Sequence, residues 1–315
     1  MNYSDKRVLL IGGSGTLGSN VCAELLKLGC HVDIISRSPR TSNDPLLSYI
    51  QAHATEEELS RIVKARHYDG IVNFMHYVTV DEYRPIHKLL VANTDHLIFL
   101  SSYRIYANEQ VPITENAPRL LETIDDPDFL ANENYALPKC RCEDFMKAED
   151  PNGHWTAVRP VICSSQKRFD IFTHSDHAVI ECAKAGIPMS LPECARNLTA
   201  GIDWAGNGGK LIAHLLFKPA TFGEAYNIST GQNLTWEQIA NIYTELLGAK
   251  FVWIPTEEFM NDPENNKKHN PWAVIYDRMF DRKMDVSKVM AATGLTEKDF
   301  LPIKDGIAIE LAKVQ

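Results

Sequence analysis

The stretch Val8–Gly18, VLLIGGSGTLG, determines the fold of the N-terminal half of this chain. Its four leading apolar residues are typical of a short buried strand, and two glycines end that strand. A helical pattern of apolar residues follows from Leu17 to Leu28. Glycine permits a tight turn and lets backbone N–H groups approach a phosphate closely. A strand, a glycine turn and a helix in this order therefore predict a dinucleotide-binding loop built on Gly12, Gly15 and Gly18.

Outward from this stretch, short apolar runs alternate with helical patterns. We expect strands near residues 32–35, 71–75, 97–100 and 157–160, and helices near 56–65 and 135–148. This alternation predicts an α/β fold with a doubly wound parallel sheet. The second half is less regular, with helices expected near 176–185, 207–217, 236–247, 287–292 and 304–313, and a strand near 225–228. The polar residues 256–271 predict a mobile loop.

Composition excludes several classes of protein. The chain has 315 residues, of which 44% are hydrophobic and 23% charged, as in ordinary globular proteins. Its net charge of -9 argues against a nucleic-acid partner. No apolar run of about 18 residues predicts a membrane span, and the N-terminus lacks a signal-peptide pattern. Seven scattered cysteines predict reduced thiols in a cytoplasmic protein. The eleven histidines show no metal-binding spacing, so we expect no metal.

The end of the second predicted strand bears on which dinucleotide binds. An acid at this point bonds the ribose 2′-hydroxyl of NAD, whereas an Arg accommodates the 2′-phosphate of NADP. The sequence here reads Ile35-Ser36-Arg37, and Asp33 lies too early in the strand. Ser36 and Arg37 therefore favour NADP(H) over NAD(H). The alternative for Arg37 is a solvated loop charge.

Tyr135 and Lys139 are four residues apart, a spacing that places them on one face of a helix. Pro138 requires this helix to start near Asn134 or Tyr135, because proline is tolerated only in the first turn. A nearby cation favours the phenolate form of a tyrosine. Such a phenol can exchange a proton with a substrate hydroxyl or carbonyl.

The glycine pattern and this Tyr–Lys pair resemble the short-chain dehydrogenase/reductase superfamily. The segment Phe99–Tyr106, FLSSYRIY, is similar to the S-S-x-x-x-Y segment of its extended branch, which contains nucleotide-sugar epimerases and dehydratases. The resemblance implies a Rossmann-type fold with a smaller C-terminal α/β substrate-binding lobe. Residues 1–163 plus about 198–230 would form the dinucleotide-binding domain, and about 164–197 and 231–315 the substrate-binding lobe. It also implies a homodimer.

The resemblance further implies roles for individual residues. Tyr135 is the acid/base, Lys139 holds the nicotinamide ribose and lowers the pKa of Tyr135, and Ser102 bonds the reacting oxygen, with Ser101 as the alternative. Cofactor contacts are implied for Gly12, Gly15, Thr16, Leu17, Gly18, Ser36, Arg37, Phe74, Tyr135, Lys139 and Pro160. Substrate contacts are implied for Ser102, Tyr103, Arg196 and Arg278.

The second half matches that branch more loosely. Arg196 and Asp203 are similar to an R-x-x-x-x-x-x-D segment whose Arg can contact a nucleotide-sugar diphosphate. A surface ion pair is the alternative for Arg196. Only 28 residues separate Asn73 from Ser102, and the helix signature N-V-x-G-T of the family is missing there, so we expect a shortened wall beside the cofactor.

Several reactions remain open from the sequence. Tyr103 and Arg104 stand where the 4,6-dehydratases carry an Asp-Glu pair, which disfavours dehydration. Epimerisation of a nucleotide sugar through a 4-keto intermediate and net reduction of a keto-sugar remain, and Arg37 favours the NADPH-dependent reductase. The alternatives are reduction of a non-sugar carbonyl compound and a non-catalytic regulatory or RNA-binding relative. The intact Ser102, Tyr135 and Lys139 argue against the last of these.

Overall fold

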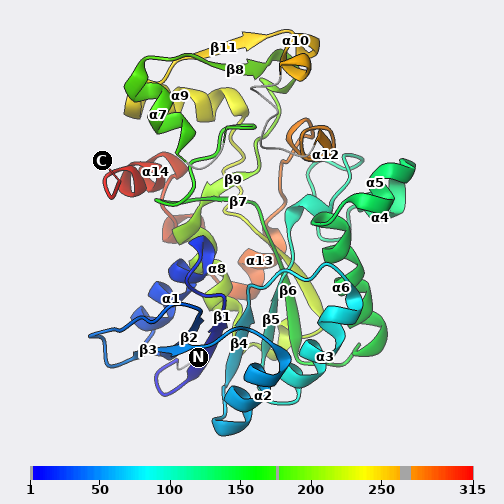
Figure 1. Ribbon diagram of the computed structural model, residues 1–315, viewed down its shortest axis with the longest axis vertical. Helices are drawn as coiled ribbons and strands as arrows, with labels where there is room; N and C mark the ends of the chain where they lie inside the picture. Colours follow the sequence, from blue (N-terminus) through cyan, green and yellow to red (C-terminus); the bar gives the residue numbers. More distant parts are fainter. Residues whose placement is uncertain (1–2, 175–176, 263–270, 315) are drawn as a thin grey trace.

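The computed structural model describes residues 3–174, 177–262 and 271–314. Its centre is a parallel seven-stranded sheet of order β10-β6-β5-β4-β1-β2-β3 (Figure 1). The direction of winding reverses between β1 and β4, as in the Rossmann fold. This arrangement confirms the predicted doubly wound sheet. The strands are β1 (Arg7–Ile11), β2 (His31–Ser36), β3 (Leu47–Gln51), β4 (Gly70–Asn73), β5 (Leu97–Leu100), β6 (Trp155–Pro160) and β10 (Glu224–Ile228).

Helices cover both faces of this sheet (Figure 1). On one face α1 (Thr16–Lys27) packs against α8 (Ala205–Leu215). On the other face lie α2 (Glu56–Ala65), α3 (Val80–Val91) and α6 (Ala136–Glu149), with α3 in contact with both neighbours. Because both faces are covered, β4 and β6 are buried along their whole length.

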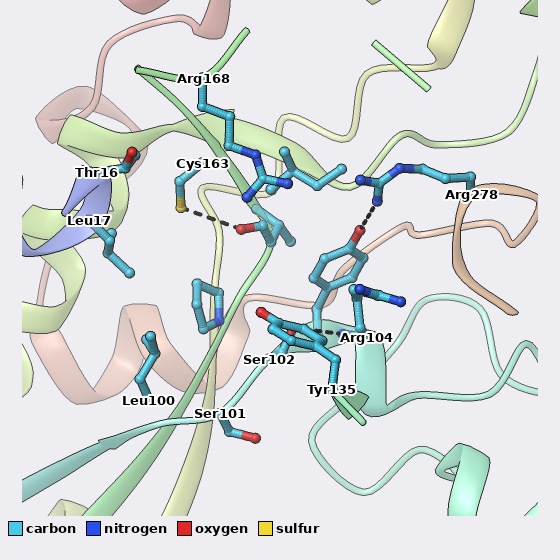
Figure 2. A pocket seen from close by; sticks show the side chains of 14 residues that line it. Thr16, Leu17, Leu100, Ser101, Ser102, Arg104, Tyr135, Cys163, Arg168 and Arg278 are labelled. Atoms are coloured by element: carbon cyan, nitrogen blue, oxygen red, sulfur yellow. Dashed lines mark hydrogen bonds between the residues drawn. The ribbon is translucent and has the colours of Figure 1, made fainter. Parts of the chain in front are cut away.

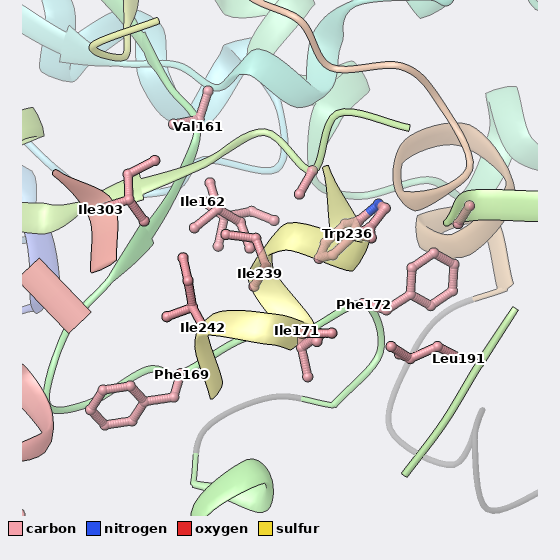
Figure 3. Close-up of a cluster of buried hydrophobic side chains, with 14 of the residues drawn as sticks. Val161, Ile162, Phe169, Ile171, Phe172, Leu191, Trp236, Ile239, Ile242 and Ile303 are labelled. Carbon is pink, nitrogen blue, oxygen red and sulfur yellow. The ribbon is translucent and has the colours of Figure 1, made fainter. Parts of the chain in front are cut away.

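A second lobe lies beyond the carboxyl ends of the strands, at the top of Figure 1. Its core forms around Trp236 and Ile239 of α9 and includes Phe172 and Leu191 (Figure 3). Two short parallel pairs support it, β7 with β9 and β8 with β11. Its elements are β7 (Ile162–Ser164), α7 (Ala178–Ala185), β8 (Met189–Pro192), β9 (Ile202–Trp204), α9 (Trp236–Leu247), β11 (Phe251–Ile254), α10 (Thr256–Asn261) and α14 (Ile303–Leu311).

Shorter elements connect the two parts. Helix α13 (Ser287–Thr293) packs against α8 and β10 of the sheet. The remaining helical segments are α4 (Leu120–Thr123), α5 (Pro127–Asn132), α12 (Pro271–Ala273), a π-helical turn (Val274–Arg278) and 3₁₀ turns at Tyr103–Ile105, Glu193–Ala195, Pro219–Thr221 and Glu297–Asp299.

Two expectations differ from the structure. Residues 256–271 were expected as one loop, but Thr256–Asn261 form α10, anchored by the buried side chain of Phe259; residues 263–270 lie outside the described part. The region between Asn73 and Ser102 lacks the N-V-x-G-T signature and yet contains helix α3. Thr79 caps that helix by accepting from the N–H of Glu82 at 3.2 Å. This segment therefore contains a helix although the family signature is missing.

Candidate active site

A cavity of about 270 Å³ opens beyond the carboxyl ends of the central strands, beside the glycine loop (Figure 2). Ligands of open α/β sheets bind at this edge, where the strand order reverses. The cavity is lined by residues from the start of α1, the segments after β5 and β6, the start of α6 and the π-helical turn. The lining residues are Thr16, Leu17, Leu100, Ser101, Ser102, Tyr103, Arg104, Tyr135, Pro160, Val161, Ile162, Cys163, Arg168 and Arg278.

The glycine loop has the shape that a dinucleotide phosphate requires. Gly12 has a positive φ of 78°, and a Cβ on Gly18 would lie 2.5 Å from the Cα of Gly13. Gly15 is the N-cap of α1 and provides no side-chain cap. The nearest atom to a Cβ built on Gly15 is 3.7 Å away, so this side of the loop is open. The first N–H groups of α1 are thus available to a pyrophosphate, and the loop fits a nicotinamide dinucleotide.

A second cavity, of about 590 Å³, lies on the other side of the loop. Gly12, Gly15, Ser36 and Arg37 line it together with Ser14, Ile35, Ala52, His53, Ala54, Thr55 and Met75, and none of these is acidic. Phe74, predicted as a cofactor contact, lines neither this cavity nor the first, and instead packs against the core beneath the loop.

Asp33, the acid nearest to this second cavity in the sequence, is engaged elsewhere. Its carboxylate forms ion pairs with Arg7 at 3.1 Å and Arg66 at 3.2 Å and accepts a hydrogen bond from Tyr68 at 2.9 Å. The Asp33 side chain is 1% exposed. Asp33 therefore does not offer a carboxylate to a bound ribose.

Local capping positions Tyr135. Helix α6 begins at Ala136, with Tyr135 as its N-cap residue. The buried carboxylate of Glu133 accepts hydrogen bonds from the N–H groups of Tyr135, Ala136 and Leu137 at 3.1, 3.0 and 2.9 Å. Three such bonds to one charged group are strong and hold the first turn in place. The helix start agrees with the one predicted from Pro138.

Lys139 lies beside Tyr135, one turn further along α6. Its Nζ donates to the carbonyl of Leu100 at 2.7 Å and lies 5.4 Å from the centroid of the Tyr135 ring. Lys139 is 3% exposed, whereas Tyr135 is 36% exposed. The buried ammonium group therefore supports a phenol that remains accessible from the cavity.

The charges around Tyr135 favour its phenolate form. Burial by itself raises the pKa of the phenol and is the largest single effect, whereas the positive charges of Lys139 and Arg104 lower this pKa. A hydrogen bond with Ser102 and the charge of Arg168 contribute in the same direction, so the net pKa lies below its usual value. Burial also lowers the pKa of Lys139, an effect that the nearby Tyr135 opposes.

Ser102 is better placed than Ser101 to act with this phenol. Ser102 starts the 3₁₀ turn after β5, and its hydroxyl accepts from the N–H of Arg104 at 3.2 Å. In Figure 2 the Ser102 side chain lies next to the Tyr135 ring, whereas that of Ser101 extends away from it. The geometry agrees with the choice of Ser102.

Two of the predicted substrate contacts lie together in the cavity wall. The Tyr103 hydroxyl donates to Asp277 at 3.1 Å and accepts from Arg278 Nη1 at 3.0 Å. Arg278 also donates to the carbonyl of Phe172 at 2.9 Å. Both side chains line the cavity although they are 175 residues apart in the sequence.

Arg196 is placed elsewhere. Its guanidinium forms ion pairs with Glu237 at 2.5 Å and Glu193 at 3.4 Å, and it lies over the ring of Trp253 at 5.5 Å. Arg196 is absent from the lining of the cavity. The predicted diphosphate contact is thus replaced by the alternative, a surface ion pair, because Arg196 follows a 3₁₀ turn that packs beside α9.

Sequence reasoning missed Arg104 and Arg168 as cavity residues. Arg104 follows Ser102 by two residues, and its Cζ lies 4.8 Å from the centroid of the Tyr135 ring. Its nearness to the Ser102 motif was a usable signal. Arg168 pairs with Asp170 at 2.6 Å, and no sequence motif marks it.

The described part of the chain has no membrane-spanning helix and has one surface cluster of possible metal ligands. Among the described residues, no helix has the length and apolar character that crossing a membrane requires. The candidate metal ligands in this part of the chain are His67, Asp69 and Asp95 at the surface. Asp69 already binds the Lys6 ammonium at 2.6 Å.

The sheet order, the glycine loop and the Tyr–Lys pair at the start of α6 define a Rossmann-type protein of the extended short-chain dehydrogenase/reductase class. More specifically, residues 8–162 of the chain match the model of the NAD dependent epimerase/dehydratase family.

Individual relatives agree with this family. The chain is 29% identical to a UDP-glucose 4-epimerase of Lactobacillus helveticus over 36% of this chain and 40% of that enzyme. The fold is similar to UDP-N-acetylglucosamine 4-epimerase from Bacillus cereus, with a TM-score of 0.70, 16% identity and coverage of 98% of this chain and 96% of that one. It is also similar to Thermus thermophilus UDP-glucose 4-epimerase in complex with NAD, with a TM-score of 0.65, 17% identity and coverage of 97% and 98%.

Proposed function

We propose that this chain is an NAD(P)-dependent enzyme that acts on a hydroxyl or keto group of a nucleotide-activated sugar. The reaction is either an epimerisation or a net oxidation or reduction. The observation that carries the proposal is the accessible Tyr135 phenol, with its lowered pKa, beside buried Lys139 in a cavity that also reaches the glycine loop. The family match and the UDP-sugar epimerases among the similar proteins support a nucleotide sugar as substrate.

The residues of the site divide the chemistry as follows. The loop Gly12–Gly18 and the start of α1 would hold the pyrophosphate of the dinucleotide, with Lys139 near its nicotinamide ribose. When bound, the nicotinamide supplies hydride acceptance and return. The Tyr135 phenolate takes the proton of the substrate hydroxyl, and Ser102 bonds the same oxygen. Lys139 and Arg104 stabilise the phenolate before and after each transfer. In the reverse direction the Tyr135 phenol returns the proton to the keto oxygen.

The first test is to denature the purified protein, identify any released dinucleotide by mass, and then follow UDP-glucose and UDP-glucuronate by NMR with that dinucleotide present. We expect the configuration of the sugar to change at one carbon without net consumption of the dinucleotide. Failure to convert any of a panel of nucleotide sugars with either dinucleotide would contradict the proposal. Net reduction of a keto-sugar by NADPH would select the reductase over the epimerase.

An NADPH-dependent reductase, of a keto-sugar or of a non-sugar carbonyl compound, is the second candidate because Arg37 lines the second cavity and none of the described lining residues is acidic. We expect Arg37→Gln to weaken NADP(H) binding about 10- to 100-fold and to leave NAD(H) binding nearly unchanged, because a charge-assisted bond to the 2′-phosphate is lost. Calorimetric titration with both dinucleotides measures the ratio. Arg40→Gln is the matched control, since Arg40 is exposed and does not line that cavity. An unchanged ratio in Arg37→Gln would contradict NADP(H) preference.

Three further features are also proposals, of which the location is based on the scattered cysteines and the other two on the family resemblance. They are a homodimer, a cytoplasmic location, and the division into residues 1–163 plus about 198–230 for the dinucleotide and the remainder for substrate.

A further inference from the structure

Arg104 has an unusual position for a charged residue, next to the reacting group. It belongs to the 3₁₀ turn Tyr103–Ile105, directly after Ser102, and its side chain is 23% exposed. Its guanidinium carbon lies 4.8 Å from the centroid of the Tyr135 ring. Figure 2 shows the side chain beside Tyr135, in the same cavity as Arg168 and Arg278. Any group bound by Arg104 would therefore lie within a few ångströms of the substrate atom that Tyr135 serves.

Arg104 is also the least engaged of the arginines that line this cavity. Arg168 donates two bonds to Asp170, and Arg278 bonds Tyr103, Asp277 and the Phe172 carbonyl. Arg104 Nε lies 3.4 Å from an Asp277 oxygen but makes no hydrogen bond. Within the described part of the chain, the two terminal amino groups of Arg104 have no recorded hydrogen bond either. A planar fork of donors near the reacting centre is thus left for a ligand.

The nearby carboxylates do not neutralise the positive charge of the arginines around this cavity. Asp277 is shared by Arg104, Arg278 and Arg282, and Asp170 by Arg168 and Arg278. Four guanidinium groups therefore face two carboxylates. Both carboxylates lie behind the cavity wall, at 1% and 2% exposure, and none of the described residues that line the cavity is acidic. The protein as a whole has a net charge of -9, so this local positive excess is opposite in sign to the charge of the whole chain.

We infer that Arg104 binds a carboxylate on the substrate sugar, on the carbon next to the one that reacts, so that the preferred substrate is a nucleotide-activated uronic acid. This inference rests on the proposed function. A diphosphate alone would use Arg168 and Arg278 further along the wall, whereas Arg104 lies against Tyr135, where the sugar itself must sit. The planar, bidentate geometry of a guanidinium matches a carboxylate.

The test compares binding of UDP-glucuronate and UDP-glucose, two probes that differ at the carboxylate, by calorimetry without added dinucleotide. We expect the unmodified protein to bind UDP-glucuronate about 10- to 100-fold more tightly than UDP-glucose. Arg104→Leu should abolish this difference and retain the affinity for UDP-glucose. Arg104→Lys should restore part of it, because a lysine supplies charge without the bidentate fork. Arg61→Leu, an exposed arginine on α2, is the matched control.

The other outcomes separate the two proposals. Equal affinity for both probes in the unmodified protein would overturn the uronate inference and leave the proposed function standing. An equal loss of affinity for both probes in Arg104→Leu would show that Arg104 only shapes the cavity, and would also overturn it. Binding of neither probe would overturn the nucleotide-sugar function and, with it, this inference.

Discussion

Replacing Tyr135 by Phe is expected to lower kcat by about 10²- to 10⁴-fold, the usual contribution of general acid–base catalysis. The change removes only the hydroxyl, and the ring keeps its contacts with Arg104 and Lys139. Binding of dinucleotide and nucleotide sugar should therefore stay within about threefold of the unmodified protein, since the phenol acts mainly in the reaction step. Steady-state kinetics together with calorimetry measure both effects.

The pH dependence provides a second readout of the same residue. Oxidation of a hydroxyl requires the phenolate, so its rate should be constant above the pKa of Tyr135 and fall as the pH drops through it. Burial raises this pKa, but Lys139, Arg104 and other nearby groups together lower it to a net value below that of a free phenol. Arg104→Leu should therefore move the acidic limb of the profile to higher pH, for charged and neutral sugars alike.

Tyr49→Phe is the matched control for the Tyr135 experiment. Tyr49 lies on β3 at the edge of the sheet, is half-buried, and does not line the cavity. Its substitution should leave kcat and the pH profile unchanged. Full activity of Tyr135→Phe would show that the acid/base assignment is wrong.

The second large effect concerns stability. Arg159→Leu is expected to reduce the free energy of unfolding by about 3–5 kcal/mol, because it leaves the carboxylate of Glu143 buried without its partner. Arg159 and Glu143 are 1% and 0% exposed, and two hydrogen bonds of 3.0 and 2.5 Å join them. Arg159 also donates to the Tyr106 hydroxyl at 2.6 Å and the Glu115 carbonyl at 2.8 Å. Urea denaturation at neutral pH measures the loss.

This pair also predicts the direction of a pH effect on stability. Burial raises the pKa of Glu143, but the charge and hydrogen bonds of Arg159 lower it to a net value below its usual one. A carboxylate with a lowered folded-state pKa stabilises the fold at pH values above its unfolded pKa. That contribution is lost as the pH falls through the folded-state pKa. Arg159→Leu should remove this acid sensitivity.

Two further variants test whether an unpaired buried charge causes the loss. Arg159→Leu combined with Glu143→Leu should recover much of the stability, because no charge remains buried. Arg61→Leu breaks an exposed i,i+3 pair with Glu58 and should cost less than about 1 kcal/mol. A loss below about 1 kcal/mol for Arg159→Leu alone would contradict the explanation.

The elements predicted with most success depend on neighbours along the chain. The helix at Trp236–Leu247 begins and ends where its Thr235 cap and Gly248 indicate. The strand at Leu97–Leu100 and the helix at Glu56–Ala65 also have the predicted bounds. Helix α3 was not predicted, although Tyr83, Ile86 and Leu90 give this segment an apolar pattern of helical spacing.

The sequence by itself determined the parallel sheet, the glycine loop and the pairing of Tyr135 with Lys139, because apolar periodicity, glycine conformation and helical spacing act over a few residues. Only the tertiary structure decided which arginines surround the phenol. It brought Arg104, Arg168 and Arg278 to one cavity and left Arg196 in an ion pair with Glu237. Partners of a charged side chain that lie far apart in the sequence are chosen by packing between elements, and local pattern does not encode that choice.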